Sequence, residues 1–447
     1  MQKRLGLQRL IFSIIILFSL STLKAEPVYR IIAENYTITG RTRQNVIENI
    51  LGSSVGTEFD SQEAVSLFAA DRKRKLDNLR AFKDSSVTIL YEEETDGLIP
   101  VSLKVSITDG SAFLPFPFAF YNSNQGFLCG AMANVPNVSG TLQNLLFMGL
   151  YSAPPNEDNK LQWAEPNFLL VGNWSNIRLN PLLFTLSGSV MRMNRQIEYL
   201  GKSQNKFLAL ILSGRIGAEL PITDILSAKT SVRYSYSPKH TIEYVRDESL
   251  LPYGPIDSTV GTNLGFTVKS LNWEGNFRRG YKIDVTGGIE TTYPSFASQQ
   301  TSVDGEAEVS VYYLASSRFN PQARLSFFGK SHLPQLDSGF RVRGIRNGEL
   351  RGNAGVYLNT GLQIQLLKFS SMEIHFTPCF DAVFLYTHNT STRPYDLGLA
   401  AGGELLVFLN SLKSLPMKLG VGFDLRPEDK NGSGNFYEID FSFNLTF

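Results

Sequence analysis

The residues best suited to specific chemistry are arginines in one glycine-rich stretch between two segments that read as strands. The stretch contains Arg341, Arg343, Arg346 and Arg351. A guanidinium is a planar fork that binds a carboxylate through two parallel hydrogen bonds, so such residues position chain segments rather than catalyse reactions. Two interpretations are open: a solvated surface loop, or a loop that folds inward and fixes one arginine on a carboxylate of a surrounding wall.

Other reactive side chains are not arranged for catalysis. The four histidines form no HExxH or His-x-His pair, and no GxSxG elbow or phosphate-binding loop occurs. Two widely separated cysteines, Cys129 and Cys379, exclude a disulfide scaffold and a thiolate metal cluster. A formal net charge of +1 in 447 residues gives no basis for nucleic-acid binding. We therefore expect no enzyme activity, no cofactor, no metal and no nucleic-acid partner.

The first 25 residues read as a signal peptide. Lys3, Arg4 and Arg9 precede an apolar core over residues 10–20, and Ala25 is the small residue that suits a cleavage site. An uncleaved anchor helix is the alternative, although the core is short for a membrane span. After this segment there is no apolar run long enough for a second membrane helix. The chain is thus expected to be exported.

Residues 26–110 read as a small α+β domain of order β-α-α-β-β. Thr42 and Ser61 are plausible caps of two helices with apolar residues at helical spacing. Residues 86–91 predict a strand, and a further strand alternates cleanly: Val101, Leu103, Val105 and Ile107 share one face. The basic run at residues 72–75 is most simply a solvated helix face.

Residues 111–447 change character, because helical periodicity gives way to alternating segments of about ten residues separated by turn-forming clusters. Sixteen candidate strands can be laid out, an even number at a pitch that suits a membrane barrel. The last alternates throughout, with the apolar residues Tyr437, Ile439, Phe441, Phe443, Leu445 and Phe447. Export, an even strand count and a terminal Phe favour a transmembrane antiparallel β-barrel over a soluble sandwich. The fold class is therefore mainly β, with residues 331–355 as the loop that could fold inward.

Several motifs resemble those of the POTRA-barrel superfamily, which includes outer-membrane protein assembly factors, the bacterial surface antigen family and two-partner secretion transporters. Val342-Arg343-Gly344-Ile345 looks like its VRG(F/Y) loop. Asn137 to Thr141 is similar to its N-x-x-G-x-G turn, with Leu142 in place of the last Gly, and Phe380-Asp381-Ala382 resembles its F-x-D-x-G wall motif. The terminal strand resembles the family's targeting signal, and the β-α-α-β-β domain resembles a single polypeptide-transport-associated (POTRA) domain. Only one such domain fits, whereas family members usually carry more.

The resemblance implies how the loop is held. Asp381 falls on the polar side of its strand by parity, which predicts a position facing the lumen. The family places the partner of the loop arginine there, so an Arg343–Asp381 pair is expected.

The resemblance also implies insertion or translocation of client polypeptides at the bacterial outer membrane, with the POTRA domain in the periplasm. Its edge strand, at Val87, Thr88 and Ile89, would bind an extended client by strand addition. The first barrel strand, near residues 113–121, and the last would form a lateral seam; Pro115 and Pro117 suit such an edge or a linker before it. Expected partners are unfolded or nascent outer-membrane polypeptides, the lipid bilayer and, as further candidates, periplasmic chaperones or accessory lipoproteins. A secretion pore for one dedicated client and a passive porin are the rival functions.

Overall fold

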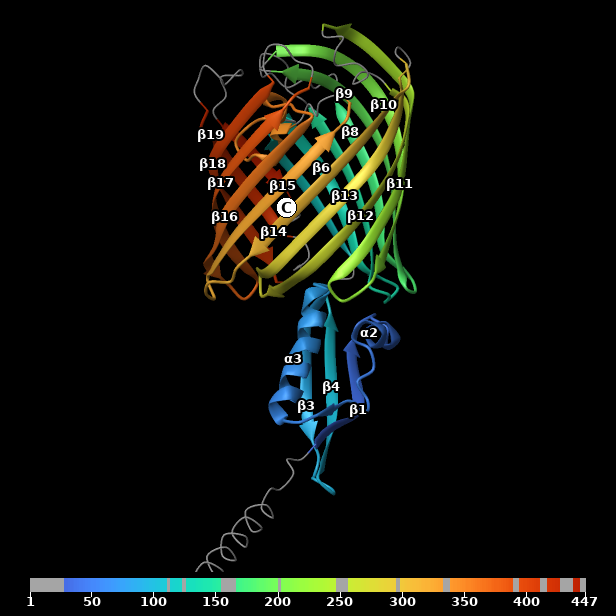
Figure 1. The fold of residues 1–447 in the computed structure, drawn as a ribbon, viewed down its shortest axis with the longest axis vertical. Helices are drawn as coiled ribbons and strands as arrows, with labels where there is room; N and C mark the ends of the chain where they lie inside the picture. The colour runs from blue at the N-terminus through green and yellow to red at the C-terminus, as the bar shows by residue number, and fades with distance from the viewer. Residues whose placement is uncertain are drawn as a thin grey trace, which may run out of the picture. The chain divides into compact units, whose positions relative to one another are not determined.

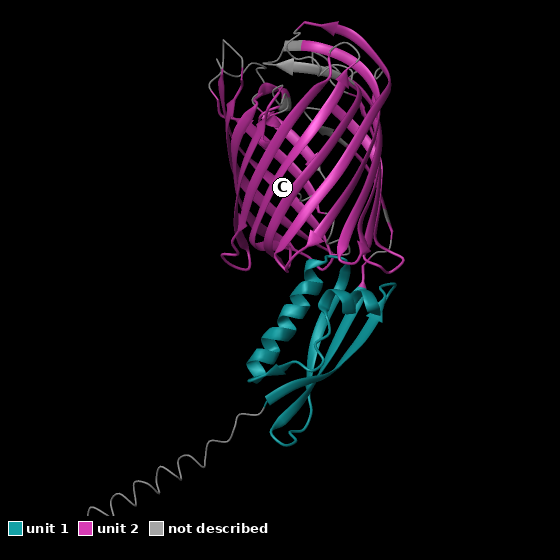
Figure 2. Cartoon of the chain, turned by 45° about the vertical axis from the view of Figure 1, so that its right-hand side comes forward, with its two compact units in different colours: residues 1–108 teal, residues 109–447 magenta. Residues whose placement is uncertain are grey.

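The computed structural model describes residues 28–110, 113–122, 126–153, 166–199, 202–246, 256–294, 298–332, 338–388, 394–410, 416–426 and 437–442. The expected signal peptide, residues 1–25, lies outside this range, as do Phe443, Leu445 and Phe447 of the final strand. The chain forms two compact units that divide between Thr108 and Asp109 (Figure 2). Among the described residues, no helix has the length and apolar character needed to cross a membrane.

Unit 1 is a four-stranded sheet with two helices, which confirms the expected α+β order with one additional two-residue strand. Its elements are β1 (Val28–Thr39), α2 (Gln44–Leu51), β2 (Glu58–Phe59), α3 (Gln62–Asn78), β3 (Phe82–Tyr91) and β4 (Leu98–Asp109). The sheet order is β2-β1-β4-β3, so β3 lies at one edge. The four alternating residues of β4 are buried as their spacing predicts, and Val101 and Leu103 pack with Ile31 and Val65.

Two local predictions in unit 1 are wrong. The N-cap of α2 is Arg43, without a side-chain bond, rather than Thr42, whereas Ser61 does cap α3 by accepting from the Ala64 amide at 3.2 Å. Arg72 is not on a solvated face. Its Nη2 lies 2.8 Å from Glu34 Oε1, and both side chains are buried. Arg72 occupies the apolar stripe of α3 between Phe68 and Leu76, so the helix carries it into the core.

Unit 2 is a single antiparallel sheet of sixteen strands in sequence order, which confirms the predicted strand number and fold class. The sheet curls into a barrel (Figure 1), and β20 contacts β5. The strands are β5 (Leu114–Asn122), β6 (Gly126–Val138), β7 (Gln143–Ala153), β8 (Asn167–Leu179), β9 (Leu182–Tyr199), β10 (Lys202–Pro221), β11 (Leu226–Val245), β12 (Ile256–Glu274), β13 (Phe277–Pro294), β14 (Gln300–Tyr312), β15 (Phe319–Lys330), β16 (Ala354–Lys368), β17 (Met372–Tyr386), β18 (Tyr395–Leu409), β19 (Met417–Asp424) and β20 (Tyr437–Ser442).

The two faces of the barrel wall differ as period-two alternation requires. On β17, Phe376, Phe380 and Phe384 are exposed outward, whereas the odd-numbered His375 and Asp381 are buried on the lumen side. Exposed apolar side chains also occupy one face of other strands, as with Val260, Leu264 and Phe266 on β12, so the outer surface is rich in apolar side chains. Such a surface suits an environment of lipid rather than water.

Candidate functional site

The segment between β15 and β16 folds against the lumen face of the wall. Its described part contains two short 3-10 helices, η2 (Ser338–Arg341) and η3 (Asn347–Glu349). Val342, Ile345 and Leu350 are almost completely buried and pack in one cluster with wall residues. The wall residues of this cluster are Tyr357, Val383, Leu385 and Ala400, from β16, β17 and β18. Apolar contact therefore holds the segment, called here the inner loop, inside the barrel.

Arg343 makes the polar anchor at the centre of the inner loop. Its Nε and Nη2 donate to the two carboxylate oxygens of Asp381 at 2.8 and 2.6 Å. Its Nη1 donates to Glu404 Oε2 at 3.1 Å, and Nη2 also donates to the Thr360 carbonyl at 3.0 Å. The Arg343 backbone amide adds a bond to Asp381 at 2.8 Å. The fork thus joins three neighbouring strands, β16, β17 and β18, in a way that only a planar, multidentate donor can.

Each buried carboxylate at this anchor has a cationic partner. Asp381 and Glu404 are both only 1% exposed, so their carboxylates depend on protein donors rather than on water. Lys418 on β19 lies 3.3 Å from Glu404 and 3.4 Å from Asp440 on β20. Removal of Arg343 would therefore leave Asp381 without its cation, whereas Glu404 would keep Lys418.

Arg341 provides a second anchor on the other side of the loop. Its guanidinium pairs with Glu306 on β14 and lies 5.6 Å from the ring centre of Tyr357. Its carbonyl accepts a bond of 2.7 Å from Asn359 Nδ2, and Asn359 in turn accepts from Arg324 on β15. The loop is thus tied to the wall from β14 to β18.

Gly344 brings the loop backbone against the last strands. Its φ is +116°, and a Cβ there would lie 2.5 Å from the amide nitrogen of Phe423. Gly422 on β19 is equally constrained, because its Cβ would lie 2.4 Å from the Arg343 carbonyl oxygen. The Gly344 amide donates to Glu438 Oε2 on β20 at 3.1 Å. Glycine at both positions thus permits the close approach that links the loop to the terminal strand.

The turn between β12 and β13 also contacts the distant strands β16 and β17, at the end of the barrel where β5 begins. Asn276 Nδ2 donates to Glu373 Oε2 on β17 at 3.0 Å, and the Asn276 carbonyl accepts from Gln363 on β16 at 3.2 Å. The Phe277 ring lies 4.8 Å from that of His375. Because β14 and β15 separate these strands in the sheet, the turn leans inward across their ends.

The structure brings Val342, Arg343, Gly344 and Ile345 together with Asp381, and it places Val87, Thr88 and Ile89 on the edge strand β3. Tyr437, Ile439 and Phe441 lie on β20. Sequence reasoning missed Glu404, Glu438 and Gly422. Glu404 could have been identified from the sequence, since it is the only charged residue of the apolar stretch from Leu397 to Leu409.

Among the described residues, no group of three or more His, Cys, Asp or Glu side chains could hold a metal ion.

Comparisons with known proteins show similarity in fold. No protein-family model matches the chain, and no curated protein matches it. Among solved structures, CdiB from Acinetobacter baumannii aligns with a TM-score of 0.55 and 15% identity, over 93% of this chain and 73% of that one. CdiB from Escherichia coli aligns with a TM-score of 0.52 and 10% identity, over 94% and 91%. BamA from Haemophilus ducreyi lacking POTRA domains 1-3 gives 0.50 and 12%, over 93% and 84%. The chain therefore has a BamA- and CdiB-like barrel fold.

Proposed function

We propose that this protein is an integral outer-membrane barrel that inserts or translocates client polypeptides. The observation that carries the proposal is the inner loop, which is bound to the wall by Arg343 and reaches the terminal strand through Gly344 and Glu438. A passive channel has no need for a loop tied to the strand that borders the seam. The fold shared with BamA and CdiB supports the same class of function.

The mechanism couples the loop to the seam between β5 and β20. The contacts of Lys418 with Glu404 and Asp440 extend the Arg343 network to β20, so a shift of the loop changes the support of that strand. On the other side of the seam, Pro115 and Pro117 lie within β5 and cannot donate ladder hydrogen bonds. A seam with fewer ladder bonds opens at lower free-energy cost and gives a client strand an edge to pair with.

Unit 1 supplies the first binding step in this proposal. Val87, Thr88 and Ile89 lie on β3, at the edge of the sheet, where main-chain groups can bind an extended segment with little sequence demand. Ile89 packs toward the core, so an added strand would not disturb the apolar contacts of the unit. Unit 1 would act in the periplasm as a POTRA domain, where chaperones or accessory lipoproteins are candidate partners.

A secretion pore for one dedicated client is the second candidate, and the likeness to CdiB favours it. Depletion of the protein from its host distinguishes the possibilities. An assembly factor should lower the outer-membrane level of many barrels, and a dedicated pore should block one exported client. Unchanged levels of all barrels and all exported proteins would contradict both and leave a porin. Rescue by wild type but not by Arg343→Ala would connect the phenotype to the inner loop.

A further inference from the structure

A row of glycines crosses the outer face of the wall between β7 and β11. Direct register partners lie on the same face of a sheet. Phe147 pairs with Gly172, Gly172 with Gly188, Gly188 with Gly214, and Gly214 with Tyr234. Phe147 and Tyr234, the two ends of the row, are 52% and 51% exposed, so the row faces outward. Three consecutive strands thus present no side chain at this level.

Nothing in the backbone requires these glycines. None of the three has a positive φ, and a Cβ on Gly172, Gly188 or Gly214 would meet no atom closer than 3.5 Å. Glycine weakens a strand, and within one it often marks a place where a ligand approaches the backbone closely. The lack of side chains at these three positions therefore leaves open space on the outer face of the wall.

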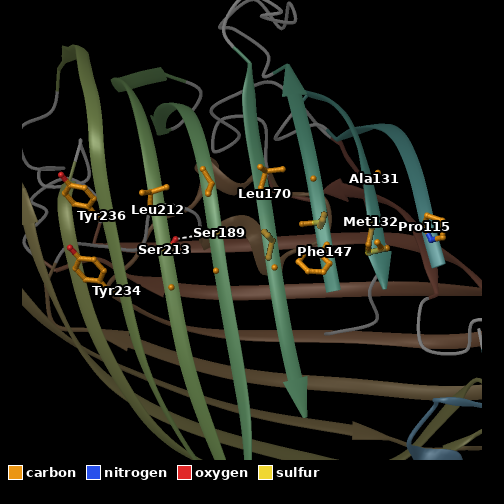
Figure 3. A pocket seen from close by; sticks show the side chains of 18 residues that line it. Pro115, Ala131, Met132, Phe147, Leu170, Ser189, Leu212, Ser213, Tyr234 and Tyr236 are labelled. Atoms are coloured by element: carbon orange, nitrogen blue, oxygen red, sulfur yellow. Dashed lines mark hydrogen bonds between the residues drawn. The ribbon is translucent and has the colours of Figure 1, made fainter. Parts of the chain in front are cut away.

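That space is an apolar trough of about 850 Å³ on the outer surface (Figure 3). The next outward row on one side of the glycines contains Leu170, Val190 and Leu212, and these side chains form one wall. On the other side, a second hollow shares the glycine floor and is bounded by Trp174, Leu186 and Ile216. Here "the trough" means the glycine floor with these two walls.

Among the described residues on this face, cations lie beyond one wall of the trough. Along β9, Arg192 follows Val190 by two residues and faces the same side, about 7 Å farther along the strand. Its register partner Leu210 pairs with Lys239, which is exposed on the same face. Among the described residues, neither Arg192 nor Lys239 makes an ion pair. The arrangement is thus an apolar channel with two available positive charges near one end.

We propose that the trough binds one anionic phospholipid, with an acyl chain over Gly172, Gly188 and Gly214 and the phosphate near Arg192 and Lys239. This inference rests on the proposed outer-membrane location. A peptide strand is a poor occupant, because the floor backbone is already paired within the sheet and the peptide's own groups would stay unpaired in hydrocarbon. An acyl chain has no such groups. One trough with two cations suits one phosphate and its acyl chains rather than a glycolipid with many acyl chains.

The first test measures lipid that remains on the full-length protein after purification in detergent, by native mass spectrometry. Wild type should keep one phosphatidylglycerol. Gly188→Leu with Gly214→Leu fills the floor without crowding the wall and should lower retention about ten-fold. The matched control is Ala307→Leu with Ala323→Leu, which adds the same kind of outward bulk on β14 and β15 and should retain the lipid. Equal retention by the filled variant, or no lipid on wild type, overturns the proposal.

The second test addresses the charges and the position. Arg192→Glu with Lys239→Glu should abolish the preference for phosphatidylglycerol over phosphatidylethanolamine. Phosphatidylglycerol with brominated chains, in phosphatidylcholine bilayers, should quench tryptophan emission, and Trp174→Phe should remove part of that quenching. Retention of a multiply acylated glycolipid or a polypeptide instead of a phospholipid would overturn the assignment. Because these assays use purified protein without a client, a negative result leaves the proposed function standing, and a failed depletion test leaves the lipid site standing.

Discussion

The two halves of the barrel wall are built from different kinds of residue. From β14 to β19, the lumen face carries large polar and charged side chains that are buried under the inner loop, such as Glu404 and Asp381. From β8 to β11 the lumen face carries small hydroxyls, as in the 2.9 Å contact between Ser189 and Ser213, together with exposed charged residues such as Arg215 and Arg233. The outer face of these strands carries the glycine row. Buried, paired networks tolerate few alternative geometries, whereas small side chains constrain a sheet little.

The two parts of the wall should differ in how easily they deform. The half with β14–β19 is held at several levels by one loop, so it should move as a block. In the half that begins with β5, the inner loop approaches β9 through η3, and this half contains the proline-bearing strand β5. We infer that the wall deforms on the β5 side of the seam while the loop-bearing side stays fixed.

The largest expected effect comes from Arg343→Ala. The change removes the cation of a buried carboxylate, a defect that typically costs about 3–5 kcal/mol, and it should release the inner loop. Protease access to residues 331–355 should rise and complementation of a depleted host should fail, while the barrel still migrates as a folded species in unheated gels. Arg343→Lys should also fail, because an ammonium cannot bond Asp381, Glu404 and Thr360 together.

Arg346→Ala is the matched control, because the Nε of Arg346 has no hydrogen-bond partner in the part of the chain that the structure describes. It should leave the protease pattern unchanged. Asp381→Ala should resemble Arg343→Ala, and the double variant should be no worse than Arg343→Ala alone, since both remove one interaction. Additive losses, or an effect of Arg346→Ala as large as that of Arg343→Ala, would contradict the loop anchor.

Glycine-to-alanine substitutions compare the two halves directly. Gly344→Ala combines an unfavourable positive φ with a clash against Phe423, for a cost of roughly 2–4 kcal/mol, and should loosen the loop. Gly214→Ala, in the other half, places its Cβ where no atom lies within 4 Å and should be neutral or slightly stabilising. The measurement is the temperature at which each variant loses its folded gel mobility. Similar shifts for both variants would mean that the halves do not differ in packing at these sites.

The β12–β13 turn should control leakage through the barrel. Asn276→Ala removes the side-chain bond to Glu373 and keeps the backbone carbonyl that accepts from Gln363, at a cost of about 1–2 kcal/mol. The turn should then leave the lumen more often, and single-channel conductance in planar bilayers should rise. Thr223→Ala is a suitable control, since Thr223 bonds only within its own turn at the same end of the barrel. Identical conductance of both variants would show that the turn is no obstruction.

Local patterns predicted the strands and several site residues. Alternation alone placed Asp381 on the lumen side, and the glycines and arginines of residues 341–355 pointed to a special loop. Contacts between residues far apart in the sequence could not be predicted from local patterns, because they depend on how the strands are brought together. Glu438 meets Gly344 across 94 positions, and the pairing of Gly422 with the loop depends on how the barrel curls. Arg72 was misread because its charged neighbours dominated the local pattern, although its place in the apolar stripe of α3 was visible.

The smallest expected effect concerns Leu142 in the β6–β7 turn, in the half that begins with β5. Leu142 has a φ of +58° and is mostly buried, and its amide donates to Asn137 Oδ1 at 2.8 Å. Leu142→Ala loses apolar burial worth about 2 kcal/mol and keeps the unfavourable backbone conformation. Leu142→Gly loses the same burial but regains about 1–2 kcal/mol, because glycine adopts this φ freely. Leu142→Gly should therefore be more stable than Leu142→Ala, the reverse of the usual order in strands, as measured by the denaturant midpoint in detergent. If Leu142→Ala were the more stable, backbone strain at this turn would not limit stability.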